Sequence, residues 1–179
     1  MFELELQAVF IDRDGTIGGT GHFIHPRDFV LYDGALDAIH LLKGKGIKVF
    51  AFTNQHRISK QQASEEEFRE QFLSYGFDDA FICPHGSTEI CNCRKPKPGM
   101  LHRAAAAYDL DLAKCAVIGD VGDTDILAAH AVGALKVLVK TGWGMGSLTD
   151  YRSSWAEVVP DYIAENLLDA VNWLLFRRL

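Results

Sequence analysis

Short apolar runs that alternate with segments of helical periodicity limit most strongly how this chain can fold. Five runs rich in Val, Ile and Phe occur at 8–11, 47–52, 80–83, 116–118 and 135–139. Strands of a parallel sheet are buried on both faces and have such uninterrupted apolar sequences, and the helices between them form the crossovers. The sequence therefore predicts an α/β fold with a Rossmann-like parallel sheet and helices on both of its faces.

The segments between these runs carry helix signals. Apolar residues recur at helical spacing over 35–45, 64–75, 99–108, 123–132 and 162–176. Ser64 and Glu67 form the pattern of a capping box. Residues 15–34 are rich in glycine and lack periodicity, so we expect a flap-like loop there. The interval between Asn54 and Arg94 has room for one helix and one strand, so we expect a single domain, 1–179, with no large cap domain.

The charge and the lengths of the apolar runs limit which classes of partner the chain is expected to bind. The formal net charge is −6 and the pI is about 5.6, which disfavours nucleic acid as a partner. The N-terminus has no signal-peptide pattern, and no run is long and apolar enough to cross a bilayer. We therefore expect a cytoplasmic protein without a membrane partner, and a small anionic ligand is compatible with this charge.

Polar residues gather where the predicted strands end. In an open α/β sheet the carboxyl ends of the strands meet at one edge, and ligands bind there. The residues in these positions are Asp12 and Asp14 after the first strand, Thr53 and Asn54 after the second, 94–99 before the third helix, and Asp120 and Asp125 after the fourth strand.

These residue types fit phosphoryl transfer. Magnesium binds few carboxylates together with carbonyl oxygens and water, so Asp12, Asp120 and one backbone carbonyl form a plausible magnesium site. A carboxylate can attack phosphorus to form an acyl phosphate, which suits Asp12, and Asp14 can protonate the leaving alkoxide and then deprotonate water. Thr53 and Asn54 can donate hydrogen bonds to phosphoryl oxygens, and a lysine of the third cluster can balance their charge.

Two points stay open from the residues alone. The charge-balancing lysine is Lys95 or Lys97, and spacing does not choose between them. Asp12 and Asp14 could also be ordinary turn or N-cap residues, since Asp-Gly is a common turn dipeptide. The ordered appearance of four polar clusters at strand ends favours the catalytic interpretation.

Four motifs in the chain resemble those of the haloacid dehalogenase superfamily. They lie at 10–16, 52–55, 94–100 and 119–125, within a stretch of resemblance from about 8 to 142. The resemblance implies a magnesium-dependent phosphatase that forms an aspartyl-phosphate intermediate on Asp12. It also implies roles for Asp14 as acid/base and magnesium ligand through its backbone carbonyl, Thr53 as phosphate binder, Lys95 as charge-balancing lysine, Asp120 as magnesium ligand and Asp125 as support for the water shell of the metal.

A second set of metal-ligand residues lies between the second and third motifs. Three thiolates and one imidazole, the ligand types that zinc prefers, come from Cys83, His85, Cys91 and Cys93. In a chain without a secretion signal, such clustering favours a metal over disulfides. A closed site of this kind is structural and would fix the loop that follows it. The alternative is a set of buried reduced cysteines beside a surface histidine, and Cys115 fits that description.

The cysteine cluster makes the chain similar to the zinc-bearing phosphatases of heptose bisphosphate and histidinol phosphate. That likeness implies that Arg94 binds substrate and that the substrate is a small phosphorylated metabolite such as a sugar phosphate or bisphosphate. Two substrate-facing neighbourhoods depart from the pattern, at 56–60 and at Val121, where the heptose enzymes tend to have a lysine. A histidinol-phosphate or nucleotide phosphatase is therefore kept as an alternative.

The sequence disfavours two other functions. A non-catalytic phosphate-binding module would not need the intact catalytic set, and the acidic charge disfavours a phosphatase of nucleic-acid ends.

Trp143 and Trp155, in the loop at 141–160, are expected to be packing residues. The apolar face of the last predicted helix suits packing on the domain or a subunit interface, so we expect a monomer or a homodimer.

Overall fold

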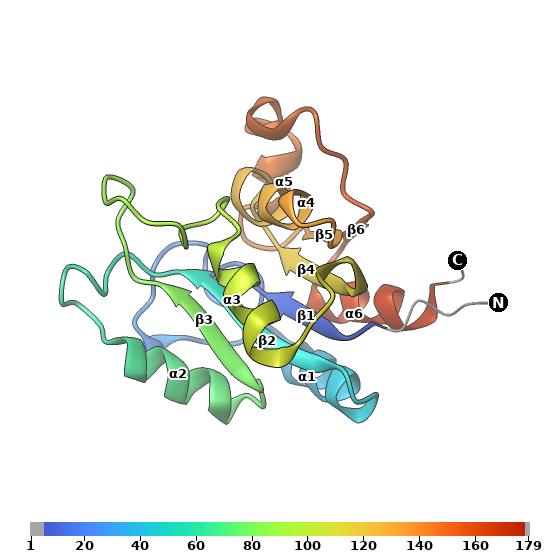
Figure 1. Ribbon diagram of the computed structural model, residues 1–179, viewed down its shortest axis with the longest axis horizontal. Coiled ribbons are helices and arrows are strands. Elements are labelled where there is room, and N and C mark those ends of the chain that lie inside the picture. The colour runs from blue at the N-terminus through green and yellow to red at the C-terminus, as the bar shows by residue number, and fades with distance from the viewer. Residues whose placement is uncertain (1–5, 178–179) are drawn as a thin grey trace.

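The computed structural model describes residues 6–177, and Figure 1 shows a sheet of parallel strands at its centre. Six strands within these residues lie in the order β3-β2-β1-β4-β5-β6, and every neighbouring pair is parallel. Their bounds are β1 Ala8–Ile11, β2 Lys48–Asn54, β3 Asp79–Cys83, β4 Cys115–Gly119, β5 Leu135–Val139 and β6 Tyr162–Ala164. The five predicted strands and their parallel arrangement are confirmed. This order places β1 in the middle of the sheet, between β2 and β4.

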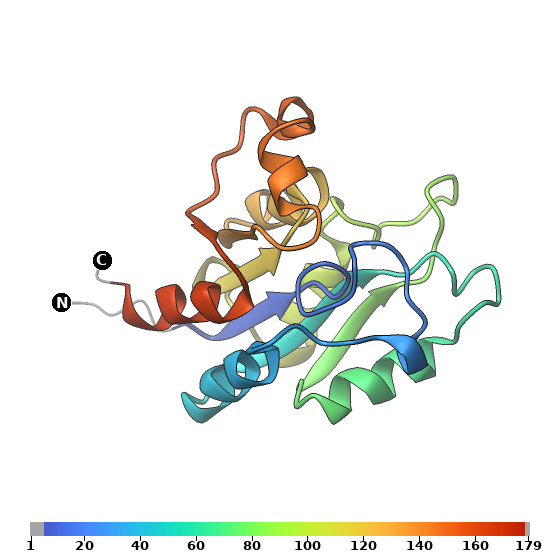
Figure 2. The same ribbon diagram turned by 180° about the vertical axis from the view of Figure 1, so that it is seen from behind.

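Helices cover both faces of the sheet, as the two opposite views show (Figures 1 and 2). Alternate side chains of a strand point to opposite faces. Val9 and Ile11 belong to one apolar cluster, and Ala8 and Phe10 belong to the other. The first cluster contains residues of α1 (Ala35–Gly44), α2 (Glu65–Ser74) and α6 (Leu167–Phe176), and the second contains residues of α3 (Gly99–Tyr108) and α4 (Leu127–Ala131). The predicted two-sided α/β architecture is therefore confirmed.

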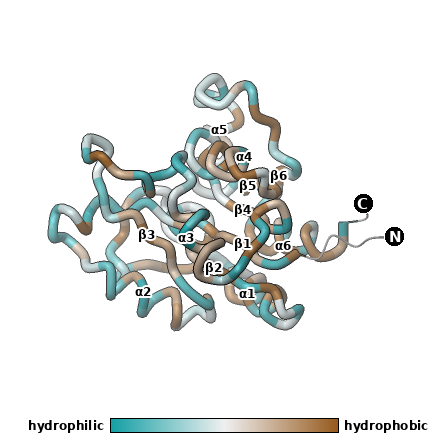
Figure 3. Tube along the Cα trace, viewed as in Figure 1, coloured by the Kyte–Doolittle hydropathy of each residue, from teal (hydrophilic) through white to brown (hydrophobic). Residues whose placement is uncertain are grey.

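Helix α2 begins with the capping box that its sequence predicts. Glu67 N–H donates to Ser64 Oγ at 3.2 Å, and Ser64 N–H donates to Glu67 Oε2 at 2.8 Å. These two bonds satisfy backbone donors that a helix start leaves without partners. Hydrophilic residues colour much of α2 and of the outer loops in Figure 3, which agrees with the position of α2 at the surface.

The prediction of one helix over 162–176 is wrong for its first part. Tyr162–Ala164 forms β6 and pairs in parallel with β5 at the edge of the sheet. Helix α6 starts only after Asn166, whose side chain accepts a hydrogen bond from Asp169 N–H at 3.0 Å. An asparagine at this position favours a helix start there, and the open edge of β5 supplies backbone partners for the residues before it.

The prediction of a continuous α-helix over 123–132 also needs correction. Gly122–Ile126 forms a π-helical turn, and α4 covers only Leu127–Ala131. The Asp125 side chain accepts a hydrogen bond from Val121 N–H at 3.1 Å, which holds this wider turn directly after β4. Wider turns of this kind are frequent at functional sites, and periodicity alone does not reveal them.

The loop at 15–34, called the flap below, runs from the end of β1 to α1. It contains a short 3₁₀ turn at Pro26–Asp28, and Gly18 forms isolated bridges with Asp14 and Leu31. After β5, α5 (Gly144–Leu148) and a 3₁₀ turn at Arg152–Trp155 precede β6. Among the residues that the structure describes, no helix has the length and apolar character needed to span a membrane. Residues 1–5, where we expect no signal peptide, lie outside the described part.

Candidate active site

The ends of β1 and β4 bring Asp12 and Asp120 together. Ile118 pairs with Ile11 in the register of these strands, and its carbonyl accepts a hydrogen bond from Asp12 N–H at 3.0 Å. Asp12 is 7% exposed and Asp120 is fully buried. The close approach depends on Gly15, where φ is +86° and an added Cβ would lie 2.1 Å from Asp120 Oδ2. The glycine that follows the two aspartates is therefore required by both space and backbone conformation.

The Lys95 ammonium group lies among these carboxylates. Its Nζ donates to Asp12 Oδ1 at 2.8 Å, to Asp125 Oδ1 at 2.6 Å and to the Phe52 carbonyl at 2.8 Å. All three ammonium protons therefore have acceptors. Burial lowers the pKa of Lys95, but the negative charges of Asp12 and Asp125 outweigh this effect and raise the pKa above its ordinary value. The lysine stays charged at neutral pH.

Asn54 orients the loop that carries this lysine. Its side-chain oxygen accepts a hydrogen bond from Lys95 N–H at 3.0 Å, and its amide donates to the Lys95 carbonyl at 3.3 Å. Lys97 is exposed and donates to the Cys91 carbonyl at 2.6 Å. Of the two lysines that the sequence left open, the structure places Lys95 beside the carboxylates and Lys97 away from them.

The three aspartates gather more negative charge than Lys95 balances. One oxygen atom from each of Asp12, Asp120 and Asp125 lies within 4.8 Å of the other two. Burial, together with the charges of Asp12 and Asp125, raises the pKa of Asp120 well above its ordinary value. Burial likewise raises the pKa of Asp125 to about 7, even though Lys95 opposes the shift. A divalent cation would relieve this repulsion, and an all-oxygen donor set fits magnesium.

Asp14 is held from two sides at the same edge. Arg13 Nη1 donates to its Oδ1 at 2.6 Å, and Gln55 Nε2 donates to its Oδ2 at 2.6 Å. Gln55 Nε2 also lies 2.9 Å from Thr53 Oγ1, which is itself buried. Burial raises the pKa of Asp14 to about 6, although the charge of Arg13 and the hydrogen bond from Gln55 lower it. A carboxyl group in this range can both give and take a proton near neutral pH.

Arg13 has a positioning role that sequence reasoning missed. It is fully buried, with its guanidinium carbon 3.8 Å from the centroid of the Phe29 ring and 4.9 Å from that of Phe68. Its Nε donates to Gln71 Oε1 at 2.9 Å, and its Nη2 donates to the Ile24 carbonyl at 3.0 Å. Arg13 thus links Asp14 to the flap and to α2. An arginine after a strand is usually exposed, so only its place beside the aspartates could have indicated this role.

These side chains open onto a cavity of about 410 Å³. Asp120 is not part of the lining, but one of its carboxylate oxygens lies within 4.8 Å of an Asp12 oxygen. The cavity is also lined by Trp143, which is partly buried and, as expected, packs against neighbouring rings, those of His22 and Tyr151. Trp155 is 2% exposed and packs with Ile126 and Leu138, as expected. Seven of the predicted site residues share the lining: Asp12, Asp14, Thr53, Asn54, Arg94, Lys95 and Asp125.

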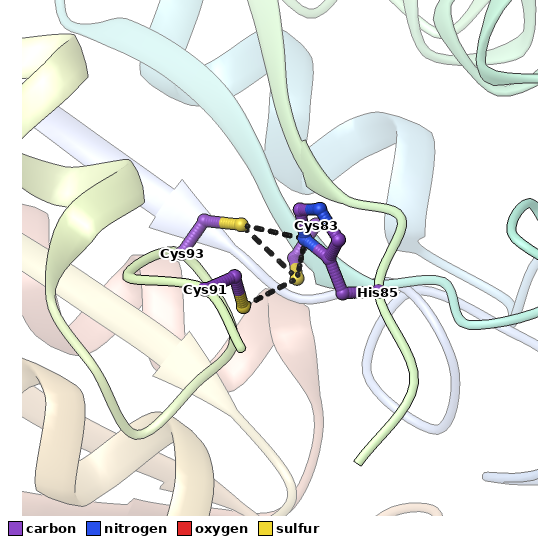
Figure 4. Close-up of side chains that lie close together, drawn as sticks. All are labelled: Cys83, His85, Cys91 and Cys93. Atoms are coloured by element: carbon purple, nitrogen blue, oxygen red, sulfur yellow. Dashed lines mark hydrogen bonds between the residues drawn. The ribbon is translucent and has the colours of Figure 1, made fainter. Parts of the chain in front are cut away.

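The cysteine and histidine residues form a separate cluster beyond the end of β3 (Figure 4). Its members are Cys83, His85, Cys91 and Cys93, whose ligand atoms all lie within 4.8 Å of one another. The side chains point toward a common centre, with Cys83 Sγ 3.2 Å from Cys93 Sγ and 4.0 Å from Cys91 Sγ. Zn–S bonds of about 2.3 Å in a tetrahedron place sulfur atoms about 3.8 Å apart. The cluster therefore has the composition and approximate size of a four-ligand zinc site.

The Cys83 thiol is buried beside the other members of this cluster. Burial, and then the hydrogen bond with Cys93, raise the pKa of Cys83 to about 12. A thiolate at Cys83 therefore needs nearby positive charge. Arg94, the next residue after the cluster, donates from Nη1 to the His85 carbonyl at 3.0 Å and lines the cavity. The cluster and the cavity are thus joined through one short stretch of chain.

Comparisons with known proteins point to one family. A family model described as HAD-hydrolase-like matches residues 92–170. The D-glycero-beta-D-manno-heptose-1,7-bisphosphate 7-phosphatase of Vibrio cholerae is 34% identical over 176 residues, which cover 88% of this chain and 92% of that protein. The enzyme of the same name from Salmonella typhi is 34% identical over 166 residues, which cover 83% of this chain and 88% of the Salmonella protein.

A solved structure shows the same likeness in three dimensions. It is the D,D-heptose 1,7-bisphosphate phosphatase from B. bronchiseptica, complexed with magnesium and phosphate. It superposes with a TM-score of 0.80 at 29% identity and covers 94% of this chain and 98% of its own. The fold of this chain therefore has a counterpart in a phosphatase that was solved with magnesium and phosphate.

Proposed function

Because the chain belongs to the HAD-like hydrolase family, we propose that it is a magnesium-dependent phosphatase that removes one phosphate from a sugar bisphosphate resembling heptose 1,7-bisphosphate. The observation that carries this proposal is the presence of Asp12, Asp14 and Lys95 in the lining of one cavity, with Lys95 hydrogen-bonded to Asp12. A carboxylate, an acid/base group and a fixed positive charge are what stepwise hydrolysis of a phosphomonoester needs.

The reaction proceeds in two steps in this proposal. The Asp12 carboxylate attacks phosphorus while the bond from phosphorus to the sugar oxygen breaks, and Asp14 donates its proton to that oxygen. In the second step, a water molecule attacks the phosphorus of the aspartyl phosphate through its oxygen, and Asp14 takes a proton from that water molecule. Inorganic phosphate leaves, and the Asp12 carboxylate is regenerated.

Neighbouring residues hold the reacting groups. Lys95 balances the charge that three phosphoryl oxygens and Asp12 bring together, and Thr53 and Asn54 bind and orient the phosphoryl group. Arg94 binds the part of the substrate that remains outside the reacting phosphate. Asp12, Asp120 and the Asp14 backbone carbonyl would hold magnesium, and Asp125 would support its water shell. The bound ion would neutralise charge on the phosphoryl group.

We also assign a structural zinc ion to the cysteine and histidine cluster. Four protein ligands close the coordination sphere and leave no position for substrate. None of the four lines the cavity, which supports a structural rather than a catalytic role. The proposed task of the ion is to fix the loop that places Arg94 and Lys95.

The test is phosphate release from a panel of phosphate esters. The panel contains heptose 1,7-bisphosphate, fructose 1,6-bisphosphate, histidinol phosphate, a nucleoside monophosphate and p-nitrophenyl phosphate, each with magnesium or with EDTA. The proposal predicts magnesium-dependent turnover, with the highest kcat/KM for the heptose bisphosphate. A preference of tenfold or more for histidinol phosphate or the nucleotide would reject the proposed substrate class while leaving the chemistry intact.

A further inference from the structure

The segment after β5 is tied directly to the reacting centre. Trp143 N–H donates to Asp120 Oδ2 at 2.8 Å, and Thr141 Oγ1 donates to the Gly15 carbonyl at 2.7 Å. The backbone at Trp143 therefore has a fixed position relative to a carboxylate of the proposed magnesium site. Its indole ring lines the cavity.

The indole is also held from the side of the flap. An added Cβ at Gly21 would lie 2.6 Å from its Cδ1 and 2.7 Å from its Nε1, so the flap backbone rests on the ring. The His22 ring meets the indole edge to face, with centroids 5.2 Å apart. Tyr151 packs against it in a similar geometry at 6.1 Å. Contacts from two segments far apart in sequence thus keep the ring in one orientation.

The remaining lining shows what the ring can contact. Tyr151 and Phe23 add aromatic surface to the cavity, and Val121 adds an aliphatic side chain. Phe23 and Val121 carry no polar group. The rest of the lining outside the proposed reacting groups includes polar side chains, those of Gln55, His56, Asp123, Thr124, Ser147 and Ser154. Aromatic rings in ligand pockets pack against the apolar faces of ligand rings, while a few polar groups fix orientation. The apolar members of the lining are therefore suited to the carbon skeleton of the substrate, and the polar members to its hydroxyl groups.

We propose that Trp143 is a specificity-determining residue, whose indole packs against the ring of the leaving group. This inference rests on the proposed function, because it concerns the part of the same substrate that lies beyond the reacting phosphate. The bond from Trp143 N–H to Asp120 sets the distance between this ring contact and the reacting centre. The site then favours phosphate esters that carry a ring over small acyclic ones.

The test compares substrates with and without a ring. Wild type, Trp143→Ala and Trp143→Phe are assayed with heptose 1,7-bisphosphate, p-nitrophenyl phosphate and acetyl phosphate, all with magnesium. Loss of an aromatic contact of about 1.4 kcal/mol corresponds to about a tenfold rise in KM. We expect that rise for both ring-bearing substrates in Trp143→Ala, a kcat within about threefold of wild type and an unchanged KM for acetyl phosphate. Trp143→Phe restores most of the loss.

Two matched controls separate this role from a structural one. Trp173→Phe alters a tryptophan that stacks on Tyr162, with ring centroids 4.8 Å apart, and it should match wild type with all three substrates. Gly21→Ala disturbs the indole through the flap, whereas Gly46 also has a positive φ but an added Cβ there would meet no atom within 4 Å. We expect Gly21→Ala to reproduce the ring-selective rise in KM and Gly46→Ala not to do so.

The outcomes distinguish this inference from the proposed function. An equal rise in KM for acetyl phosphate and for the ring-bearing substrates, or no rise for either, would overturn the role of Trp143. If heptose bisphosphate is not hydrolysed by wild type but p-nitrophenyl phosphate is, the proposed substrate is rejected. The comparison of p-nitrophenyl phosphate with acetyl phosphate then still decides the role of Trp143.

Discussion

Two groups of metal-ligand residues lie at the same edge of the sheet, and they differ in burial, in chemistry and in access. The carboxylate cluster, Asp12, Asp120 and Asp125, is buried around Lys95 and reaches the cavity. The cysteine and histidine cluster is mostly half-buried and lines no part of that cavity. Hard oxygen ligands that keep an open side suit a catalytic ion, and a closed set of soft ligands suits a structural one.

The two clusters are neighbours along the chain. Only Arg94 separates Cys93, a ligand of one cluster, from Lys95, the cation of the other. In the proposed function, the carboxylate cluster performs the chemistry and the cysteine and histidine cluster supports the loop that carries Lys95. Changes in the carboxylate cluster should therefore abolish turnover and preserve the fold, and changes in the cysteine cluster should affect stability more than chemistry.

Removal of the proposed nucleophile should have the largest effect. Asp12→Asn keeps the size of the side chain but cannot form the acyl phosphate, so kcat should fall by more than about 1,000-fold. Initial rates with p-nitrophenyl phosphate measure this loss, and the far-UV CD spectrum should stay that of wild type. Retention of a tenth of the wild-type rate would remove Asp12 from the mechanism.

Replacement of the buried lysine should come next. Lys95→Met removes the charge that meets Asp12 and the phosphoryl oxygens, and we expect kcat to fall by about 100- to 1,000-fold. The matched variant Lys97→Met alters an exposed lysine of the same loop and should change kcat by less than about twofold. The reverse ranking of the two variants would show that the loop presents Lys97 to substrate during turnover.

Disruption of the cysteine cluster should act mainly on stability. Cys93→Ser should reduce bound zinc from one per chain to nearly none, lower Tm by about 5–10 °C and lower kcat by only about tenfold. Cys115→Ala changes a buried cysteine outside the cluster and should keep the zinc. Metal analysis of protein purified without chelators provides the measurement. A zinc-free wild-type protein would contradict the structural-zinc assignment.

The smallest expected effect is a shift in pH dependence. Asp14 must be protonated to donate to an alkoxide, so kcat/KM for heptose bisphosphate should fall as pH rises through the pKa of Asp14, about 6. p-Nitrophenyl phosphate serves as the reference substrate, because its leaving group needs no proton. Dividing kcat/KM for heptose bisphosphate by kcat/KM for p-nitrophenyl phosphate corrects for ionisation of the phosphate group. Gln55→Leu removes a hydrogen bond that stabilises the carboxylate, so the pKa rises and the ratio of the two kcat/KM values falls at higher pH. A fall of this ratio at lower pH in Gln55→Leu than in wild type would contradict the assignment of Asp14 as the proton donor.

The arrangement of the sheet and most of the site could be predicted because they depend on local patterns. Continuous apolar runs indicate buried parallel strands, and polar residues directly after them must share one edge. The strand at 162–164 was missed because three residues are too few to show a period, and its pairing depends on the open edge of β5. The π-helical turn at 122–126 was missed because one extra residue in a turn hardly alters the helical pattern.

Long-range packing explains the site residues that the sequence did not indicate. The buried position of Arg13 depends on rings from the flap and from α2, and the placement of Trp143 depends on a bond to Asp120. None of these partners is close in sequence to the residue that it positions. Residue types and spacing therefore predicted the groups to which we assign the reaction, whereas the groups that orient them became visible only in the fold.

The most direct test of the central claim is to trap the phosphorylated enzyme during turnover. Sodium borohydride reduces an aspartyl phosphate to homoserine, which peptide mass spectrometry locates in the chain. The account predicts homoserine at position 12 when the protein turns over p-nitrophenyl phosphate with magnesium, and none with EDTA. Turnover that leaves Asp12 unmodified, or homoserine at another aspartate, would contradict it.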